Sequence, residues 1–190
     1  MIEVRARKQA ERLVAPIGRF LARMHVSPAG VTLAGLVITI GGAVLVAVGQ
    51  LAVGSWIVVI GSIVDSLDGA VARATGKVTD RGAFVDSVAD RMGETAMWAA
   101  VVVAVPTQPV AVLCVLVLGG SLLTSYLRAK AESVGIDGTG GVFGRAERII
   151  LYTVGLTFSG ILVPVLWILV VGTWVTVAYR FSINWRQLRE

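Results

Sequence analysis

The sequence predicts an all-α membrane protein with six transmembrane helices and an amino-terminal amphipathic helix in the membrane interface. Hydrophobic residues make up 56% of its 190 residues and charged residues only 15%, a composition typical of polytopic membrane proteins. Residues 24–64, 95–127 and 149–179 contain no Asp, Glu, Lys or Arg. At about 20 residues for each span, these three stretches leave room for several transmembrane helices.

The first predicted element is a basic amphipathic helix over residues 1–24. Its apolar side chains share one helical face and its Arg and Lys side chains lie elsewhere, so we expect it to lie on membrane lipid in the plane of the interface. The apolar face consists of Leu13, Ile17, Phe20, Leu21 and Met24. Residues 25–190 then form one membrane domain.

The first uncharged stretch contains two predicted spans. Ser27 and Pro28 are typical of the cap and the first residue of a helix, and they precede a span over residues 31–48. Gly49-Gln50 is a turn signal, after which the second span runs from Leu51 into an acidic motif.

The other two stretches are divided in the same way. The segment Pro106-Thr107-Gln108-Pro109 separates a third span, beginning near Gly82, from a fourth that ends near Tyr126. Ser159-Gly160 and the following Pro164 separate a fifth span, beginning near Glu147, from a sixth that ends near Arg180. The turn signals therefore predict six spans.

Lys and Arg residues gather on one side of this topology. The amino-terminal segment, the link after the second span, the link after the fourth span and the carboxyl-terminal tail hold all of them except Arg91. The positive-inside rule therefore places both termini and the acidic motif on the cytoplasmic side of the cell (inner) membrane. The net charge of +5 follows from this placement and requires no nucleic-acid partner. The single cysteine, Cys114, cannot form an internal disulfide.

The acidic motif predicts a cluster of carboxylates. Asp65 and Asp68 are three residues apart and Asp86 and Asp90 are four apart, so each pair lies on one face of a helix. The polar link over residues 74–81 is typical of a turn between helices, which would bring the two faces together. Glu94, one turn beyond Asp90, extends the acidic face.

Such a cluster needs compensating positive charge. A carboxylate near the bilayer centre costs about 2.5 to 3.5 kcal/mol on insertion scales. Hard oxygen ligands on two helices suit Mg²⁺ or Mn²⁺, and these ions often act in pairs on phosphate oxygens. The alternative is that the acids form interfacial salt bridges with Arg73, Arg81 and Arg91.

The same residues carry a family resemblance. The pattern Asp65-x₂-Asp68-Gly69-x₂-Ala72-Arg73-x₈-Gly82-x₃-Asp86-x₃-Asp90 resembles the complete signature of the CDP-alcohol phosphatidyltransferases. The resemblance implies a homodimeric enzyme that transfers the phosphatidyl group of CDP-diacylglycerol (CDP-DAG) to a polar alcohol and releases CMP. It also implies that the four aspartates hold two divalent ions, and that Asp90 accepts the proton of the acceptor hydroxyl.

A second set of residues is expected to bind CDP-DAG. Glycines of the motif let a nucleotide or a diphosphate approach the helix backbone, and an arginine of the motif offers a planar cation for a phosphate oxygen. The segment after Ser27 resembles the family's Pro-x-x-Val-Thr segment, which lies near the nucleotide. The expected set is Pro28, Ala29, Gly30, Val31, Gly69, Arg73, Thr79 and Gly82.

A third set is expected to bind a second anionic group, the phosphate of the acceptor. Arginines at the cytoplasmic ends of three different spans would converge beside the metals. Residues 125–132 and 140–148 also resemble segments of the actinobacterial phosphatidylinositol phosphate synthases, although Arg128 and Lys130 exchange the cations found there. The expected set is Arg128, Lys130, Arg145, Arg148 and Arg180. The predicted acceptor is inositol 1-phosphate, with glycerol 3-phosphate as the alternative.

Two other classes of protein also place acids in membranes. Intramembrane prenyltransferases use Asp-rich helices, Mg²⁺ and a diphosphate donor, but they lack the Asp-Gly-x₂-Ala-Arg spacing. A cation channel or transporter would need carboxylates along a path across the membrane. The acids of this chain gather toward one side, which disfavours a pore.

Overall fold

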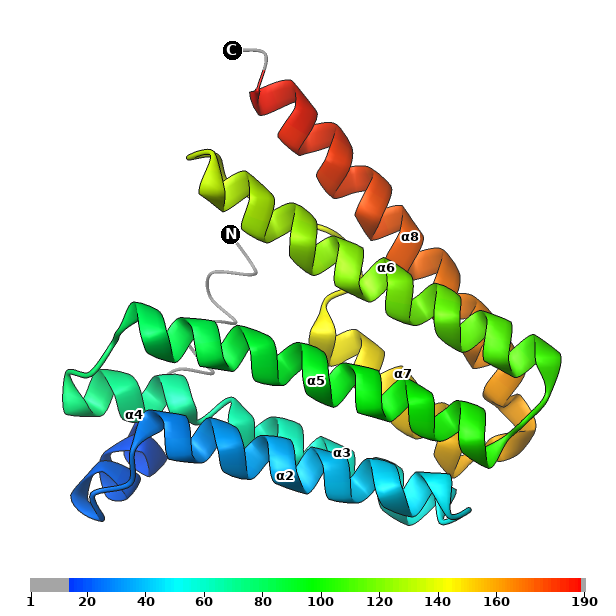
Figure 1. Ribbon diagram of the computed structural model, residues 1–190, viewed down its shortest axis with the longest axis horizontal. Coiled ribbons are helices and arrows are strands. Elements are labelled where there is room, and N and C mark those ends of the chain that lie inside the picture. The colour runs from blue at the N-terminus through cyan, green and yellow to red at the C-terminus, as the bar shows by residue number, and fades with distance from the viewer. Residues whose placement is uncertain (1–13, 189–190) are drawn as a thin grey trace.

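The computed structural model describes residues 14–188, and every regular element in this range is a helix (Figure 1). A helix over residues 14–23 comes first. The others are α2 (Pro28–Ala47), α3 (Leu51–Asp65), α4 (Asp68–Thr75), α5 (Asp80–Ala104), α6 (Gln108–Ser133), α7 (Arg145–Thr157), the 3₁₀ helix η1 (Ser159–Ile161) and α8 (Leu162–Gln187). The prediction of an all-α protein is confirmed for this part of the chain.

Six of these helices form a closed ring. In ring order, α2 packs on α3, α3 on α7, α7 on α8, α8 on α6, α6 on α5, and α5 again on α2. Successive helices of the chain run in opposite directions, so α2, α5 and α7 begin where α3, α6 and α8 end (Figure 1). We call this side of the ring the polar end, because the acidic motif lies there.

Within residues 14–188, four stretches are long and apolar enough to cross a membrane: Pro28–Ala47, Leu51–Thr75, Gln108–Ser133 and Ser159–Gln187. They correspond to the first, second, fourth and sixth predicted spans. The third predicted span, α5, carries charged residues in its first half, and the fifth, α7, has 13 residues. The two remaining spans of the six-span prediction are therefore not identified by length and composition alone.

The outer surface of α2 shows why these helices suit lipid. Leu33, Val37 and Val44 are more than half exposed, whereas the buried face consists mainly of small and hydroxyl-bearing residues together with two valines. A helix in water buries its large apolar residues, while a membrane helix can turn them to lipid and pack through small ones. The arrangement of α2 is therefore that of a membrane helix.

Close approach of α2 and α3 fixes the position of the acidic motif. A Cβ atom on Gly42 would lie 2.7 Å from the carbonyl oxygen of Gly54, and one on Gly35 would lie 2.7 Å from the Cβ of Asp65. Both distances are too short for a side chain, so the two backbones meet directly. Asp65 at the end of α3 is thus held against α2.

The core lies in the half of the ring away from the polar end. Every ring helix contributes to this single apolar cluster, and the rings of Trp98 and Tyr152 meet edge to face with centroids 5.4 Å apart. The hydroxyl of Tyr152 donates to the carbonyl oxygen of Met97 at 3.4 Å. Fully buried members from the six helices are Val46, Val58, Trp98, Val117, Tyr152 and Leu166.

The amino-terminal helix lies against the polar end. A Cβ on Gly18 would lie 2.8 Å from the backbone of Ala70 in α4, so the two short helices are in close contact. Ile17, Phe20 and Met24 of the predicted apolar face are exposed. Leu13 and the residues before it lie outside the described range.

Candidate active site

Three helices bring carboxylates together at the polar end. α3 ends at Asp65, the helix is interrupted at Ser66-Leu67, and α4 begins at Asp68. Gly76 ends α4 in the left-handed conformation, with φ of 65°, and the turn that follows returns the chain as α5. Asp86 lies in the second turn of α5. Carboxylate oxygens of Asp65, Asp68 and Asp86 all lie within 4.8 Å of one another.

Two donors orient the carboxylate of Asp68. The hydroxyl of Thr32 on α2 donates to Oδ2 at 2.7 Å, and the backbone N–H of Gly69 donates to Oδ1. Thr32 is itself buried. The side chain of Asp68 is therefore fixed in one orientation by a neighbouring helix.

The carboxylate of Asp65 has the properties of a metal ligand. Asp65 is 4% exposed, and its Oδ1 atom is buried without a hydrogen-bond partner. Leaving such an atom unpaired is costly unless a cation occupies the space beside it. Three convergent hard oxygen donors with one unpaired buried atom fit a divalent cation such as Mg²⁺ or Mn²⁺.

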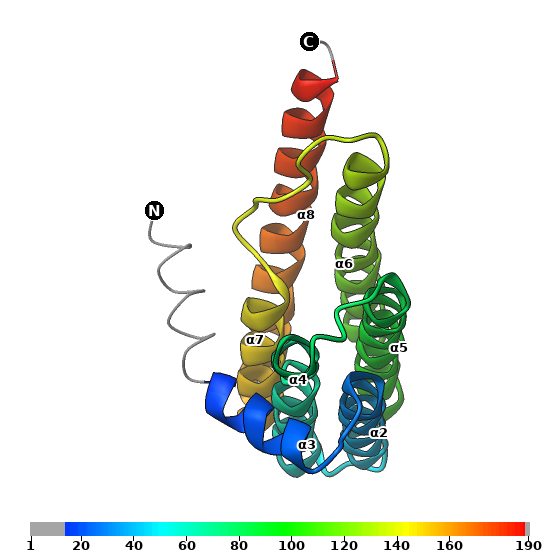
Figure 2. The same cartoon turned by 90° about the vertical axis from the view of Figure 1, so that its left-hand side faces the viewer.

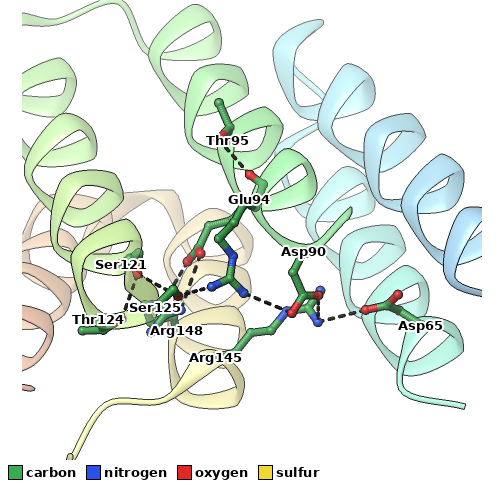
Figure 3. A network of polar contacts seen from close by, with 10 residues as sticks. Asp65, Asp90, Glu94, Thr95, Ser121, Thr124, Ser125, Arg145 and Arg148 are labelled. Atoms are coloured by element: carbon green, nitrogen blue, oxygen red, sulfur yellow. Dashed lines mark hydrogen bonds and ion pairs between the residues drawn. The ribbon is translucent and has the colours of Figure 1, made fainter. Parts of the chain in front are cut away.

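Asp90 has different partners from this trio, and Figure 3 shows it near Asp65 with the side chain of Arg145 between them. Its Oδ2 accepts from Nη2 of Arg91 at 3.0 Å, and its Oδ1 contacts Nη1 of Arg145. The same Nη1 atom of Arg145 lies 2.9 Å from Oδ2 of Asp65. The structure thus brings three of the four predicted aspartates together and connects the fourth to them through Arg145. Among the arginines weighed as salt-bridge partners, Arg91 makes such a contact in the described range.

A cavity of about 700 Å³ adjoins the carboxylates. Its lining residues belong to α5, α6, the segment that enters α7, and α8. α6 and α8 run side by side and lean away from α2, α3 and α5 (Figures 1 and 2). Asp86 and Asp90 line one side of it, and four of the five predicted acceptor-binding cations line it as well: Arg128, Arg145, Arg148 and Arg180. Lys130 is exposed and is not among the lining residues.

The arginines of the cavity differ in how firmly they are held. Arg148 is buried, and its Nε donates to Oε1 of Glu94 at 2.8 Å (Figure 3). Arg180 donates to two backbone carbonyl oxygens, those of Gly140 at 2.8 Å and Thr124 at 2.6 Å. Arg128 forms an exposed pair with the side chain of Glu132 at 2.8 Å.

The loop between α6 and α7 covers this side of the cavity with a fixed shape. The N–H of Thr139 donates to Oδ1 of Asp137 at 2.9 Å, and hydrogen bonds from Thr139 lower the pKa of Asp137 below its usual value. Phe143 N–H donates to the hydroxyl of Thr176 at 3.0 Å. The loop is therefore attached to α8 before it enters α7.

The residues predicted to bind CDP-DAG lie at the start of α2, on α4 and at the start of α5. Pro28, Ala29 and Gly30 form the first turn of α2 and are partly or fully exposed, whereas Val31 is buried. The hydroxyl of Ser27 accepts from the N–H of Gly30 at 3.1 Å. In this segment the accessible groups are mainly backbone ones.

The motif residues of this set lie on α4 and at the start of α5. Gly69 and Arg73 are one turn apart on α4, and a Cβ on Gly69 would lie 3.3 Å from Nη1 of Arg73. The hydroxyl of Thr79 caps α5 by accepting from the N–H of Gly82 at 3.1 Å. Thr79 and Gly82 thus form the hydrogen bond that caps the start of α5.

Thr32 and Ser125 carried no role in the sequence prediction, and Arg91 was considered only as a salt-bridge partner of the acids. Thr32 binds Asp68 across a sequence separation of 36 residues. Arg91 contacts the hydroxyl of Ser125 on α6 as well as Asp90. The position of Thr32, just after the predicted start of the first span, could have indicated that it lies at the same end of the protein as the acidic motif. Nothing in the sequence pairs Arg91 with Ser125.

Comparisons with known proteins agree with this geometry. The sequence profile of the CDP-alcohol phosphatidyltransferase family matches residues 25–180. A phosphatidylinositol phosphate synthase of Mycolicibacterium smegmatis is 37% identical over 172 residues, covering 86% of this chain and 77% of its own. Among solved structures, Mycobacterium tuberculosis phosphatidylinositol phosphate synthase with CDP-DAG bound is similar, with a TM-score of 0.83 and 30% identity, covering 92% of this chain and 94% of the other. The same enzyme in complex with manganese and citrate gives a TM-score of 0.83, 30% identity, and coverage of 90% and 88%.

Proposed function

Since the chain belongs to the CDP-alcohol phosphatidyltransferase family, we propose that it transfers the phosphatidyl group of CDP-DAG to inositol 1-phosphate. In this reaction the acceptor's hydroxyl oxygen forms a bond to the phosphorus that carries the diacylglycerol. The bond from that phosphorus to the bridging oxygen breaks, and CMP leaves with the electron pair. The products are phosphatidylinositol phosphate and CMP.

One observation carries the proposal: the carboxylates of Asp65, Asp68 and Asp86 converge beside a cavity whose wall includes four of the predicted acceptor-binding arginines. The carboxylates suit a metal-bound diphosphate, and the arginines suit a second anionic substrate. A transferase that joins a lipid diphosphate to a phosphorylated alcohol needs both kinds of site next to each other. The names of the relatives, which are phosphatidylinositol phosphate synthases, favour inositol 1-phosphate as that alcohol.

Four aspartates of the site would hold the metal. We assign Asp65, Asp68, Asp86 and Asp90 to two Mg²⁺ ions, with Mn²⁺ as an alternative. Bound divalent ions would neutralise the diphosphate and make its phosphorus more electrophilic. Thr32 keeps the carboxylate of Asp68 in position, and the approach of Gly35 keeps Asp65 in position.

The nucleotide and diphosphate of CDP-DAG would lie along the start of α2 and the motif glycines. Backbone groups of residues 28–31 would contact the nucleotide, and Gly69 and Gly82 would allow its close approach. Arg73 would donate to a phosphate oxygen. Thr79 would hold the start of α5, where the N–H groups at a helix start favour an anion.

Asp90 would act as the general base. Its carboxylate lines the cavity and lies next to Arg145, so an acceptor in the cavity would have its hydroxyl within reach. Proton transfer to Asp90 as the new bond forms makes the hydroxyl oxygen a stronger nucleophile.

The acceptor phosphate would be bound by the arginines of the cavity. Arg128, Arg145, Arg148 and Arg180 can offer paired N–H donors to phosphate oxygens, and Lys130 would contribute positive charge from the exposed surface. Glycerol 3-phosphate carries the same phosphate, so these contacts favour phosphorylated alcohols in general over neutral ones.

We also propose how the protein lies in the membrane. α5 and α7 would complete six spans, since both belong to the ring that the four apolar stretches form. Residues 1–24 would lie in the interface against membrane lipid, followed by the membrane domain of residues 25–190. Both termini and the site would face the cytoplasm at the cell (inner) membrane, and two copies would form a homodimer.

The test is CMP release by purified protein with CDP-DAG and Mg²⁺. Inositol 1-phosphate should be used much better than glycerol 3-phosphate or free inositol. Asp68→Asn and Asp86→Asn should abolish release, whereas Asp80→Asn, at the first residue of α5 and exposed, should retain it. Preference for glycerol 3-phosphate would reassign the acceptor, and full activity in excess chelator would contradict the metal assignment.

A further inference from the structure

Arg145 contacts the carboxylates that we assign to the metal. Its Nη1 atom lies between Oδ2 of Asp65, at 2.9 Å, and Oδ1 of Asp90 (Figure 3). Asp65 lies at the end of α3, Asp90 on α5, and Arg145 is the first residue of α7. One guanidinium group therefore neutralises two carboxylates from two other helices.

The same side chain also reaches the cavity. The side chain of Arg145 is 33% exposed and is part of the cavity wall. It is thus placed between the carboxylates and the space that we assign to the acceptor.

The other three predicted acceptor-binding arginines of the cavity have partners outside the metal site, whereas Arg91, which also lines the cavity, contacts Asp90 and Ser125. Arg148 is bound to buried Glu94, Arg180 to two backbone carbonyl oxygens, and Arg128 to Glu132. Within the described residues, the hydrogen bonds and ion pairs of Arg145 go to Asp65 and Asp90 alone. If divalent ions bind these aspartates, Arg145 loses its partners while the other three keep theirs.

We propose that Arg145 is an internal counter-cation that links metal binding to acceptor binding. Without metal, Arg145 neutralises Asp65 and Asp90 and so prevents two unpaired carboxylates from facing each other. Divalent ions held by Asp65 and Asp90 would compete with the guanidinium for these two carboxylates. The displaced side chain then turns into the cavity, where it binds the phosphate of the acceptor. The inference rests on the proposed function, because it uses the metal and acceptor sites assigned there.

Two consequences follow for binding equilibria. Competition means that Arg145 weakens metal binding in the absence of acceptor. An acceptor phosphate that pairs with the displaced side chain favours the displaced state, so the acceptor should tighten metal binding. By linkage, metal must tighten acceptor binding by the same factor. Arg145 is in this sense a positioning residue that orders the assembly of the site.

The experiment measures Mn²⁺ binding to the full-length protein in detergent by titration calorimetry, with and without inositol 1-phosphate and without CDP-DAG. Arg145→Gln, which keeps a polar side chain but is shorter and removes the charge, should bind Mn²⁺ at least about ten-fold more tightly than the unmutated protein, which corresponds to about 1.4 kcal/mol. The increase in Mn²⁺ affinity that inositol 1-phosphate causes should be clearly smaller for Arg145→Gln than for the unmutated protein. Arg145→Lys, which keeps the charge, should bind Mn²⁺ within a few-fold of the unmutated protein.

Arg128→Ala is the matched control for metal affinity, because Arg128 lines the same cavity but pairs with Glu132. Its Mn²⁺ affinity without acceptor should equal that of the unmutated protein. Unchanged or weaker Mn²⁺ binding by Arg145→Gln, in a variant with an unchanged melting temperature, would overturn the proposal. A lower melting temperature with weaker binding would make Arg145 a structural brace and would also overturn it. Absence of Mn²⁺ binding by the unmutated protein would instead refute the metal assignment itself.

Discussion

At the scale of single residues, the site depends on pairs that join different helices. Thr32 on α2 orients Asp68 on α4, and Glu94 on α5 binds Arg148 on α7. The first pair includes a proposed metal ligand and the second lies beneath the cavity. Loss of one member should therefore affect metal affinity in the first case and folding stability in the second.

Thr32→Val should weaken metal binding while leaving the fold intact. The substitution keeps the shape but removes the donor that holds Oδ2 of Asp68 at 2.7 Å. Partners that orient a metal ligand commonly contribute ten- to hundred-fold in affinity, so we expect a loss of about ten-fold in Mn²⁺ affinity by titration calorimetry. Thr32→Ser keeps the hydroxyl and should restore affinity, and equal effects of both variants would refute the role of the hydrogen bond.

Arg148→Ala should lower the folding stability of the protein, in addition to any effect on acceptor binding. Arg148 and Glu94 are both buried, and removal of one partner leaves an unpaired buried charge, at a cost of about 3 to 5 kcal/mol. The melting temperature in detergent should fall by several degrees. Arg128→Ala breaks an exposed pair and should change stability by less than about 1 kcal/mol. An unchanged melting temperature for Arg148→Ala would show that Glu94 finds another partner.

The sequence allowed part of this site to be predicted, and the limit has a physical cause. Asp65, Asp68 and Asp86 could be grouped because the polar link predicted a turn that brings the two acidic segments together. The expectation that Asp65 and Asp68 share one helix face was wrong, since α3 ends at Asp65 and α4 begins at Asp68. The contact of Arg145 with Asp65 spans 80 residues, and that of Arg148 with Glu94 spans 54. Such pairs depend on which helices become neighbours in the ring, and helical periodicity contains no information on that choice.

At the scale of elements, the helix boundaries follow local signals closely. Ser27 caps α2 with Pro28 at its first residue, and the chain turns at Gly49, where φ is 91°. The second predicted span, in contrast, consists of α3 and the separate α4, because the helix breaks at Ser66-Leu67. No strong breaker stands at that point in the sequence, and the break gives Asp65 and Asp68 different directions from those of a continuous helix.

Gly35→Ala should test how strongly the contact between α2 and α3 controls the site. The new methyl group would lie 2.7 Å from the Cβ of Asp65 and 2.8 Å from its backbone, so the helices must separate. Overpacking of this kind costs about 1 to 3 kcal/mol, and a displacement of about 1 Å at a reacting group can lower the rate by about a hundred-fold. We expect a lower melting temperature and a much lower kcat for CMP release.

Gly41→Ala is the matched control on the same helix. A Cβ at Gly41 meets no atom within 4 Å, and alanine favours a helix over glycine by about 0.5 to 1 kcal/mol. This variant should be as active as the unmutated protein and at least as stable. A large loss of activity in Gly41→Ala, or none in Gly35→Ala, would contradict the assigned contact.

At the scale of the whole molecule, the ring has a polar end and an apolar end. The carboxylates and the cavity lie where α2, α5 and α7 begin, while the turns at Gln50 and Gln108 lie at the opposite ends of the helices. If the six ring helices are spans, the two groups of turns must lie on opposite sides of the membrane.

Cysteine labelling in intact cells should reveal this arrangement. Gln50→Cys and Gln108→Cys should react with an impermeant thiol reagent from outside, whereas Val142→Cys, in the exposed loop between α6 and α7, should react only after the membrane is permeabilised. Native Cys114 is buried and should remain unlabelled. The reverse pattern would place the site on the outer face.

The apolar cluster at the far side of the ring has a consequence for the electrical behaviour of the membrane. All six ring helices close on one another there around Trp98, Tyr152 and their neighbours, and this layer lies beyond the buried pair of Glu94 and Arg148. An ion that enters from the polar end would have to shed its hydration shell to pass, which low-dielectric packing strongly opposes. If the six ring helices span the membrane as proposed, the ring would insulate: a membrane that contains many copies of this protein could hold its proton and ion gradients while charged substrates enter and leave from one side.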